Sequence, residues 1–554
     1  MQIVKVLAVL LMLIGTGCGG GGGGGGGSTG GSGAGNPAPP PPPSDPVTGA
    51  EAFQFLNQAT FGATPAEVNR VVDMGIEPWI DDQLTRTPSL QLPHLQSLPE
   101  PVNMVDLQPD RVDIWFRNAL HGDDQLRQRV AFALSEIMVV SQQGALNDGT
   151  FALADYYDIL AENAFGNYRD LIEVVTLHPA MGVYLSMLGN EKPDTARNIR
   201  PDENYARELM QLFSIGLVEL NIDGTEVLDN GGQPVPTYNQ AVIEGFAHVF
   251  TGWHFDSPFG FEFAFPTPEN IVMPMRLYPA YHDNGSKLLL GGEVIPAGQG
   301  GEADLDAALD NIFNHPNVGP FMAIRLIQRL VTSNPSPAYI ARVAGVFNDN
   351  GSGVRGDLGA VVKAILMDPE ARPETPTDSS GKLKEPLLRV TQLWRNYDAQ
   401  SESGRYPVIA AFVVFGQGPL QSPSVFNFFS PFYAPPGEIR DAGLVAPELQ
   451  IATEYQNTVL TNLILFQAFG LNQANPNLDP DDIYIDISDE MALAEDVDGL
   501  IDLVAEKLLG GTISTTLREE LARMLELIPV EEPLLRAAEA VYFVASSPEY
   551  AYQN

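Results

Sequence analysis

The sequence predicts an all-α body, mainly helical and globular, with minor β hairpins and long irregular loops. Beyond residue 48, apolar residues recur at the spacing typical of amphipathic helices over most of the chain. The chain has 554 residues, of which 44% are hydrophobic, so it can bury a large core. No repeat with a period of about 20–50 residues is visible, which argues against a solenoid. We expect three segments: residues 1–18, 19–48 and 49–554, the last as one helical domain or two lobes.

Residues 1–18, MQIVKVLAVLLMLIGTGC, read as the signal peptide of a bacterial lipoprotein. Lys5 is followed by an apolar stretch at 6–14 that is too short to span a bilayer, and then by three small residues and Cys18. Such signals place the lipidated cysteine directly after small residues, so we expect lipidation at Cys18. Gly15 stands where these signals usually carry Leu, and plain secretion remains the alternative.

Residues 19–48 are a glycine run followed by Ser, Gly and Pro, a composition that cannot bury a core. We interpret them as a disordered linker between a lipid anchor in the membrane and the body. The expected location is therefore the bacterial cell envelope, either the periplasm or the cell surface, with lipid anchoring.

The chain is strongly acidic and nearly free of cysteine. Its 70 acidic residues against 30 basic ones give a net charge of −40, which argues against nucleic acid as a partner. Cys18 is the only cysteine, so an internal disulfide and a thiolate metal cluster are both excluded.

The first helices of the body are indicated by apolar periodicity and by capping residues. Thr64 with Glu67 fits a capping box, and apolar patterns predict helices over 115–120 and 126–140. The clearest helix is DENYARELMQLFSIGL, at 202–217, which should begin at Asp202 and stop at Gly216.

Turn residues between 218 and 236 predict a small hairpin or loop before the next helix, which Thr237 should start with Gln240 as capping partner. Residues 257–301 should be irregular, with a short pair of strands around 287–295. The remaining helices are expected at 303–313, 319–331, 337–347, 357–367, 384–397, 457–469, 497–509, 515–527 and 534–546.

Several long stretches of the body carry a family resemblance. They are FLNQATFGAT (55–64), RVAFALSEIMVVS (129–141), LHPAMGVYLSMLGN (177–190), PDENYARELMQLFSIGL (201–217), FTGWHF (250–255), YHDNGSKLLLGG (281–292), HPNVGPFMAIRLIQRLVTSNPSPAYIARVAGVF (315–347) and SPSVFNFFSP (422–431). In these stretches the chain resembles the bacterial family catalogued as domain of unknown function 1800. The resemblance implies export, a mainly helical fold and a partner similar to alkaline-phosphatase-like hydrolases encoded nearby. It implies no established reaction and no catalytic residue.

Two histidine–aspartate groups are the candidates for chemistry. They are His254 with Asp256, and His282 with Asp283 and the nearby Lys287. Imidazole and carboxylate groups in loops can bind a divalent cation, the only cofactor suggested here, or perform acid–base catalysis. We expect the second group to lie near the 202–217 helix. Structural hydrogen bonding is the competing interpretation and the one we favour.

A polar cluster on the 202–217 helix is formed by Glu203, Asn204, Arg207 and Glu208. Residues four apart share a helix face, so we expect a buried ion-pair network that orients neighbouring helices. A binding role remains open.

Other polar patterns are weaker. Asn221, Asp223 and Glu226 only faintly resemble a calcium loop, and an acidic stretch at 479–489 is interpreted as a solvated loop. Arg325 and Arg329 share a helix face, where internal salt bridges are favoured over a ligand carboxylate or phosphate.

The sequence leaves open whether the chain is an enzyme. It lacks a G-x-S-x-G nucleophile elbow, a P-loop, a dinucleotide-binding glycine fingerprint and a haem attachment motif. The favoured reading is an exported envelope lipoprotein that acts with a partner as a binding and assembly scaffold. The alternatives are an envelope hydrolase using the two His–Asp groups, and a carbohydrate-binding surface protein using aromatic loops at 255–281 and 426–433.

Overall fold

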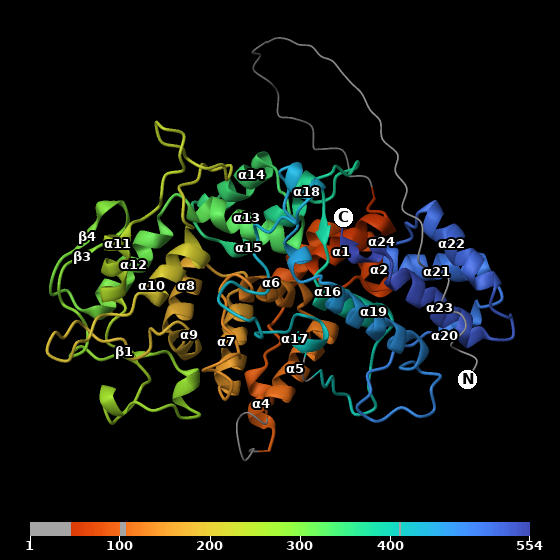
Figure 1. Ribbon diagram of the computed structural model, residues 1–554, viewed down its shortest axis with the longest axis horizontal. Coiled ribbons are helices and arrows are strands. Elements are labelled where there is room, and N and C mark those ends of the chain that lie inside the picture. The colour runs from red at the N-terminus through yellow and green to blue at the C-terminus, as the bar shows by residue number, and fades with distance from the viewer. Residues whose placement is uncertain (1–45, 100–106, 409–410, 554) are drawn as a thin grey trace, which may run out of the picture. The chain divides into compact units, whose positions relative to one another are not determined.

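Helices dominate the body, and the few strands are short (Figure 1). The computed structural model describes residues 46–99, 107–408 and 411–553, so the expected signal peptide, Cys18 and the expected linker up to residue 45 lie outside the described residues. The prediction of a mainly helical fold with minor β structure is confirmed. Residues 46–554 form one compact unit by their contacts. No helix in the described ranges is both long enough and apolar enough to cross a bilayer.

The first half of the body is a succession of helices with one long irregular excursion. These helices are α1 (Gly49–Ala59), α2 (Pro65–Met74), α3 (Ile76–Leu84), α4 (Leu92–Ser97), α5 (Gln108–His121), α6 (Gln125–Ser135), α7 (Thr150–Glu162), α8 (Tyr168–Leu177), α9 (Pro179–Tyr184), α10 (Asn204–Glu208), the π-helix η3 (Leu209–Ser214) and α11 (Gln240–Val249).

The second half continues in the same way and ends in a small bundle. It contains η4 (Phe261–Phe263), η5 (Asn270–Val272), η6 (Leu290–Gly292), α12 (Gly301–Phe313), α13 (Val318–Leu330), α14 (Pro337–Asn348), α15 (Leu358–Met367), η7 (Pro369–Ala371), α16 (Pro386–Asn396), α17 (Ala411–Val414), α18 (Glu438–Asp441), η8 (Pro447–Gln450), α19 (Glu454–Phe469), α20 (Ser488–Ala492), α21 (Val497–Leu509), α22 (Thr515–Glu526), α23 (Pro533–Ala545) and α24 (Pro548–Ala551).

The described residues contain three short antiparallel strand pairs, which lie outside the helices. They are β1 (Trp253–His254) with β2 (Arg276–Leu277), β3 (Lys287–Leu288) with β4 (Val294–Ile295), and β5 (Lys382–Leu383) with β6 (Tyr552–Gln553). The β3–β4 pair confirms the strands expected around 287–295. The β5–β6 pair joins the last described residues of the chain to the segment that precedes α16.

Capping side chains explain where several helices begin. Thr48 accepts a hydrogen bond from the backbone of Glu51 and Glu51 bonds back, a complete capping box that the sequence reading missed. Thr64 caps α2, although the Glu67 carboxylate accepts from the Trp79 indole instead.

Several helices differ from their expected limits. α5 begins at Gln108 rather than at 115, and α6 ends at Ser135 rather than at 140. α11 begins after Asn239 rather than Thr237, because the Asn239 side chain accepts from the backbone amide of Val242. The helix expected over 202–217 becomes π-helical after Glu208, where Ser214 Oγ bonds the carbonyl of Leu209 at 2.6 Å. π-helical turns are rare and often mark special sites.

The core is one continuous apolar cluster built around α6. All residues of α6 are buried, and it packs against α1, α3, α7 and α13. Phe61, Trp115 and Phe132 stack edge to face or tilted at its side, with ring centroids 5.3–5.9 Å apart. Arg129 lies in this central helix and Glu136 directly follows it, so two charged side chains are buried in the core.

Candidate functional site

His282 and Lys287 meet at a buried carboxylate that the sequence analysis did not single out, Asp304 in the first turn of α12. The distances to Asp304 Oδ2 are 3.0 Å from His282 Nε2 and 2.6 Å from Lys287 Nζ. The other ring nitrogen, Nδ1, lies 2.9 Å from the carbonyl oxygen of Thr251. The side chains of His282, Lys287 and Asp304 are at most 2% exposed. Both ring nitrogens therefore have partners, and solvent or substrate cannot reach the group.

Asp283 pairs instead with His248, near the end of α11. Its Oδ2 contacts His248 Nδ1, and its Oδ1 accepts from the backbone of Gly285 at 2.6 Å. Burial would raise the pKa of Asp283, but the hydrogen bond from Gly285 and the contact with His248 outweigh it and lower the pKa. The His248 side chain is 32% exposed. A carboxylate-oriented imidazole that reaches the surface is the arrangement a general base requires.

His254 and Asp256 do not join this group. His254 lies in β1, where Nδ1 accepts from the backbone amide of Phe255 at 2.8 Å, and burial lowers its pKa. Asp256 forms an exposed ion pair with Arg276 at 3.1 Å. Within the described ranges no three or more His, Cys, Asp or Glu side chains are arranged to hold a metal ion.

The polar cluster on α10 is less buried than expected. Glu203 and Arg207 form an ion pair at 2.9 Å, with side chains 32% and 39% exposed, and Asn204 donates its backbone amide to Asp202. Only Glu208 is buried; burial raises its pKa, and its Oε2 has no hydrogen-bond partner among the described residues.

The α10 cluster and the His248–Asp283 pair lie at opposite ends of α11. Gln240, at the start of α11, donates to Glu203, whereas His248 is near its end. Eight residues of helix separate the two by about 12 Å along the axis, so they do not form one site.

The weaker candidates take part in local structure. Asp223 Oδ1 accepts from the backbone and hydroxyl of Thr225, within a turn closed by pairing between Leu220 and Glu226. Arg325 is sandwiched between two phenylalanine rings, 5.1 Å from the Phe321 centroid and 4.5 Å from that of Phe432. Arg329, one turn further along α13, enters a buried ion network.

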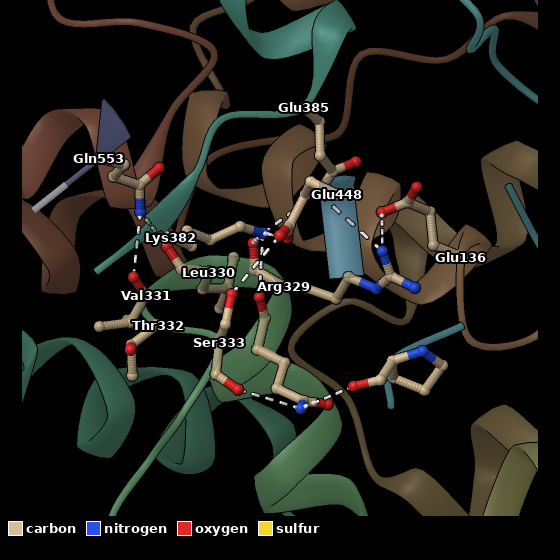
Figure 2. A network of polar contacts seen from close by, with 12 residues as sticks. Glu136, Arg329, Leu330, Val331, Thr332, Ser333, Lys382, Glu385, Glu448 and Gln553 are labelled. Atoms are coloured by element: carbon tan, nitrogen blue, oxygen red, sulfur yellow. Dashed lines mark hydrogen bonds and ion pairs between the residues drawn. The ribbon is translucent and has the colours of Figure 1, made fainter. Parts of the chain in front are cut away.

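That network is the largest concentration of buried charge in the described structure, and Figure 2 shows its centre. Arg329 Nη1 lies 3.2 Å from Glu136 and 4.0 Å from Glu385. Lys382 Nζ, which is fully buried, lies 3.3 Å from Glu385 and 3.0 Å from Glu448. The Gln553 side chain closes one side by donating to the carbonyl of Leu330 at 2.8 Å.

The network contains two glutamates with opposite electrostatic surroundings. Gln417 Nε2 bridges them, 3.0 Å from Glu136 Oε1 and 2.6 Å from Glu385 Oε2. Burial would raise the pKa of Glu385, but the charges of Lys382, Arg329 and Arg129 overcome it and lower the pKa. Burial and the neighbouring Glu385 charge together raise the pKa of Glu136, despite Arg329.

This network joins distant segments of the body and is closed to ligands. It joins the end of α6, α13, the segment from β5 to α16, and η8, and its carboxylates are at most 2% exposed. Ion pairs so buried are expensive to break, because a partner left alone becomes an uncompensated charge. Except for Lys382 and Glu385, which are three residues apart, the positions lie too far apart in sequence for spacing to reveal them. The sequence pointed only to Arg329, for which internal salt bridges were the favoured interpretation, and Arg329 does pair with Glu136 and Glu385.

A long loop between β1 and β2 leaves aromatic side chains in solvent. Phe259, Phe263 and Phe265 are 77%, 61% and 68% exposed. Phe259 and Phe263 border a hollow of about 310 Å³ that is also lined by Phe261, Glu262, Tyr278 and Tyr281. In the second aromatic segment, Phe426 and Phe432 are exposed and Phe429 is buried.

Comparison with known proteins identifies the family. A family model described as "Protein of unknown function (DUF1800)" matches residues 54–552. The chain belongs to the DUF1800 family. No curated protein and no solved structure matches it.

Five of the eight stretches that carry the DUF1800 resemblance contribute residues to the two polar centres. The network receives Arg129 and Glu136 from 129–141, Arg329 from 315–347, and Asn427, which donates to Glu136 at 3.3 Å, from 422–431. The centre around Asp304 combines 250–255 with 281–292 through Thr251 and His282. In this DUF1800 member, these stretches therefore hold the body together from within.

Proposed function

We propose that this DUF1800 protein is an exported envelope lipoprotein whose helical body serves as a scaffold for binding and assembly with a partner. Cys18 is the point of lipid attachment, and residues 19–48 are the tether between membrane and body. The partner class follows from the family resemblance: a protein similar to alkaline-phosphatase-like hydrolases.

One observation carries the scaffold role. The group formed by His282, Lys287 and Asp304 is enclosed, whereas large aromatic side chains of the same region are exposed to solvent. His282 and Lys287 are buried and both bond Asp304 Oδ2, whereas Phe259 and Phe263 are more than half exposed. Exposed aromatic clusters are characteristic of binding surfaces.

Cell fractionation tests the location. Cys18→Ser should move the protein from the membrane to the soluble fraction and abolish incorporation of labelled fatty acid, because no acyl chain can then anchor it. Thr29→Ser, a conservative change within the tether, is the matched control and should leave both readouts unchanged. Membrane retention and labelling of the Cys18→Ser variant would contradict the proposal.

An envelope hydrolase is the second candidate, and the contact between His248 and Asp283 favours it. The partly exposed imidazole would act as a general base. Chromogenic phosphate and acyl esters provide the assay. His248→Gln should abolish any turnover while leaving the melting temperature nearly unchanged. The absence of turnover by the purified wild-type protein, with no metal detected by elemental analysis, would remove this candidate.

A further inference from the structure

The aromatic loop between β1 and β2 has the features of a small-ligand site. We infer that its hollow, formed by Phe259, Phe261, Glu262, Phe263, Tyr278 and Tyr281, binds a pyranose ring of an envelope glycan. The inference rests on the proposed envelope location and names the ligand class that the scaffold holds.

The size and lining of the hollow suit one or two sugar rings. Its volume of about 310 Å³ lies at the lower end of the range for ligand pockets, and its lining is aromatic with few polar groups. Two of the lining rings, those of Phe261 and Tyr281, stack with centroids 3.9 Å apart and ring planes 11° from parallel. Aromatic faces carry negative partial charge and attract the weakly positive C–H groups on a sugar face.

Glu262 supplies the polar contact that a sugar requires. Tyr281 donates its hydroxyl to Glu262 Oε1 at 3.0 Å, which orients the carboxylate. Within the described residues no partner is recorded for Oε2, and Glu262 is exposed. A carboxylate oxygen only accepts hydrogen bonds, so it selects a ligand rich in hydroxyl donors.

The same carboxylate disfavours a lipid surface as the occupant. Glu262 lines the same hollow as the exposed rings of Phe259 and Phe263, so inserting these rings into a bilayer would bring a negative charge into the headgroup layer. Glu269 is exposed in the same loop, and the chain carries a net charge of −40, which anionic lipid would repel.

Binding to purified polymers tests the inference without depending on the location of the protein in the cell. The full-length chain carrying Cys18→Ser, so that no acyl group mediates binding, is titrated against washed peptidoglycan sacculi, chitin and cellulose. Vesicles of phosphatidylethanolamine and phosphatidylglycerol are tested in parallel. The variants are Phe259→Ala with Phe263→Ala, and Glu262→Gln. Tyr455→Ala with Phe466→Ala is the matched control, since both rings are 63% exposed on α19.

We expect saturable binding to at least one polymer. The Phe259 and Phe263 double variant should weaken it about tenfold or more, because two stacking contacts are lost. Glu262→Gln should weaken it a few-fold, and the α19 double variant should not change it. Failure of the parent chain to bind any polymer, equal loss in the α19 variant, or aromatic-dependent binding to vesicles in place of glycan would overturn the inference. Because fractionation of Cys18→Ser reports only on location, the two proposals can fail separately.

Discussion

The buried lysine of the ion network provides the sharpest test of how this body is held together. Lys382 is fully buried, and its Nζ donates to the carbonyl oxygens of Gln328 and Arg329 as well as pairing with Glu385 and Glu448. Lys382→Met keeps the length and apolar volume of the side chain but removes the charge. Glu385 loses its nearer cation, and Glu448 loses the only ion-pair partner recorded for it among the described residues.

The magnitude follows from the burial of those carboxylates. Removing one partner of a buried ion pair costs about 3–5 kcal/mol, because the remaining charge is uncompensated. The unfolding entropy per residue, summed over a unit of residues 46–554, corresponds to roughly 1 kcal/mol per degree of melting temperature. Lys382→Met should therefore lower the melting temperature by about 3–5 °C.

Lys363→Met is the matched control, since Lys363 also pairs with two carboxylates, Glu77 at 3.0 Å and Asp81 at 2.6 Å. These groups are 29–58% exposed, so the change should cost about 1 °C or less. Differential scanning calorimetry measures both variants. Adding Glu448→Gln to Lys382→Met should recover part of the loss by removing the stranded charge. Equal melting temperatures for the Lys382 and Lys363 variants, or no recovery in the double variant, would refute the reasoning.

Two further predictions concern backbone packing and pH. In Gly245→Ala, the added methyl would overlap the carbonyl oxygen of Leu288 and push α11 away from β3, so the melting temperature should fall by several degrees. In the control Gly345→Ala, the added methyl meets nothing within 4 Å, so the melting temperature should stay the same or rise slightly. A similar fall in both variants would contradict the packing argument. Burial raises the pKa of Asp158 to about 7, against the opposing hydrogen bonds from the Gln91 and Leu92 amides. Because the folded protein binds this proton more tightly than the unfolded chain, protonated Asp158 stabilises the fold. This contribution to the free energy of unfolding is fully present below pH 3.8, the ordinary pKa of aspartate, and is lost as the pH rises through about 7. Relative to Asp158→Asn, the wild type should lose up to about 4 kcal/mol in free energy of unfolding between pH 4 and pH 7, which corresponds to roughly 4 °C in melting temperature. If the difference in melting temperature between the two proteins does not change with pH, this reasoning is wrong.

Local sequence patterns determined most of the secondary structure. Apolar spacing located the long helices from α12 to α16 and from α21 to α23, and turn residues located the β3–β4 pair. These features depend on contacts within a few residues, which sequence spacing encodes directly. Apolar spacing was less reliable at the ends of helices and at irregular turns. The N-cap of α11 is Asn239 rather than Thr237, and no sequence signal indicated the π-helical turn after Glu208.

Tertiary structure alone decided which polar groups meet. His282 and Lys287 were singled out from sequence, but their shared partner Asp304 was not, and Asp283 pairs with His248 rather than with another candidate. The ion network joins Glu136 to Glu448 across more than 300 positions of chain, a relation that no local period contains.

The division follows from the range of the forces involved. Helix periodicity, caps and turns depend on neighbours along the chain, so the amino-acid order by itself determined them. The leader, the lipidation of Cys18 and the tether stay predictions from the sequence. Ion pairs and the exposure of an aromatic ring depend on which distant segments pack side by side. Only the folded body therefore decided that the His282 group is enclosed and that the rings of Phe259 and Phe263 remain in solvent.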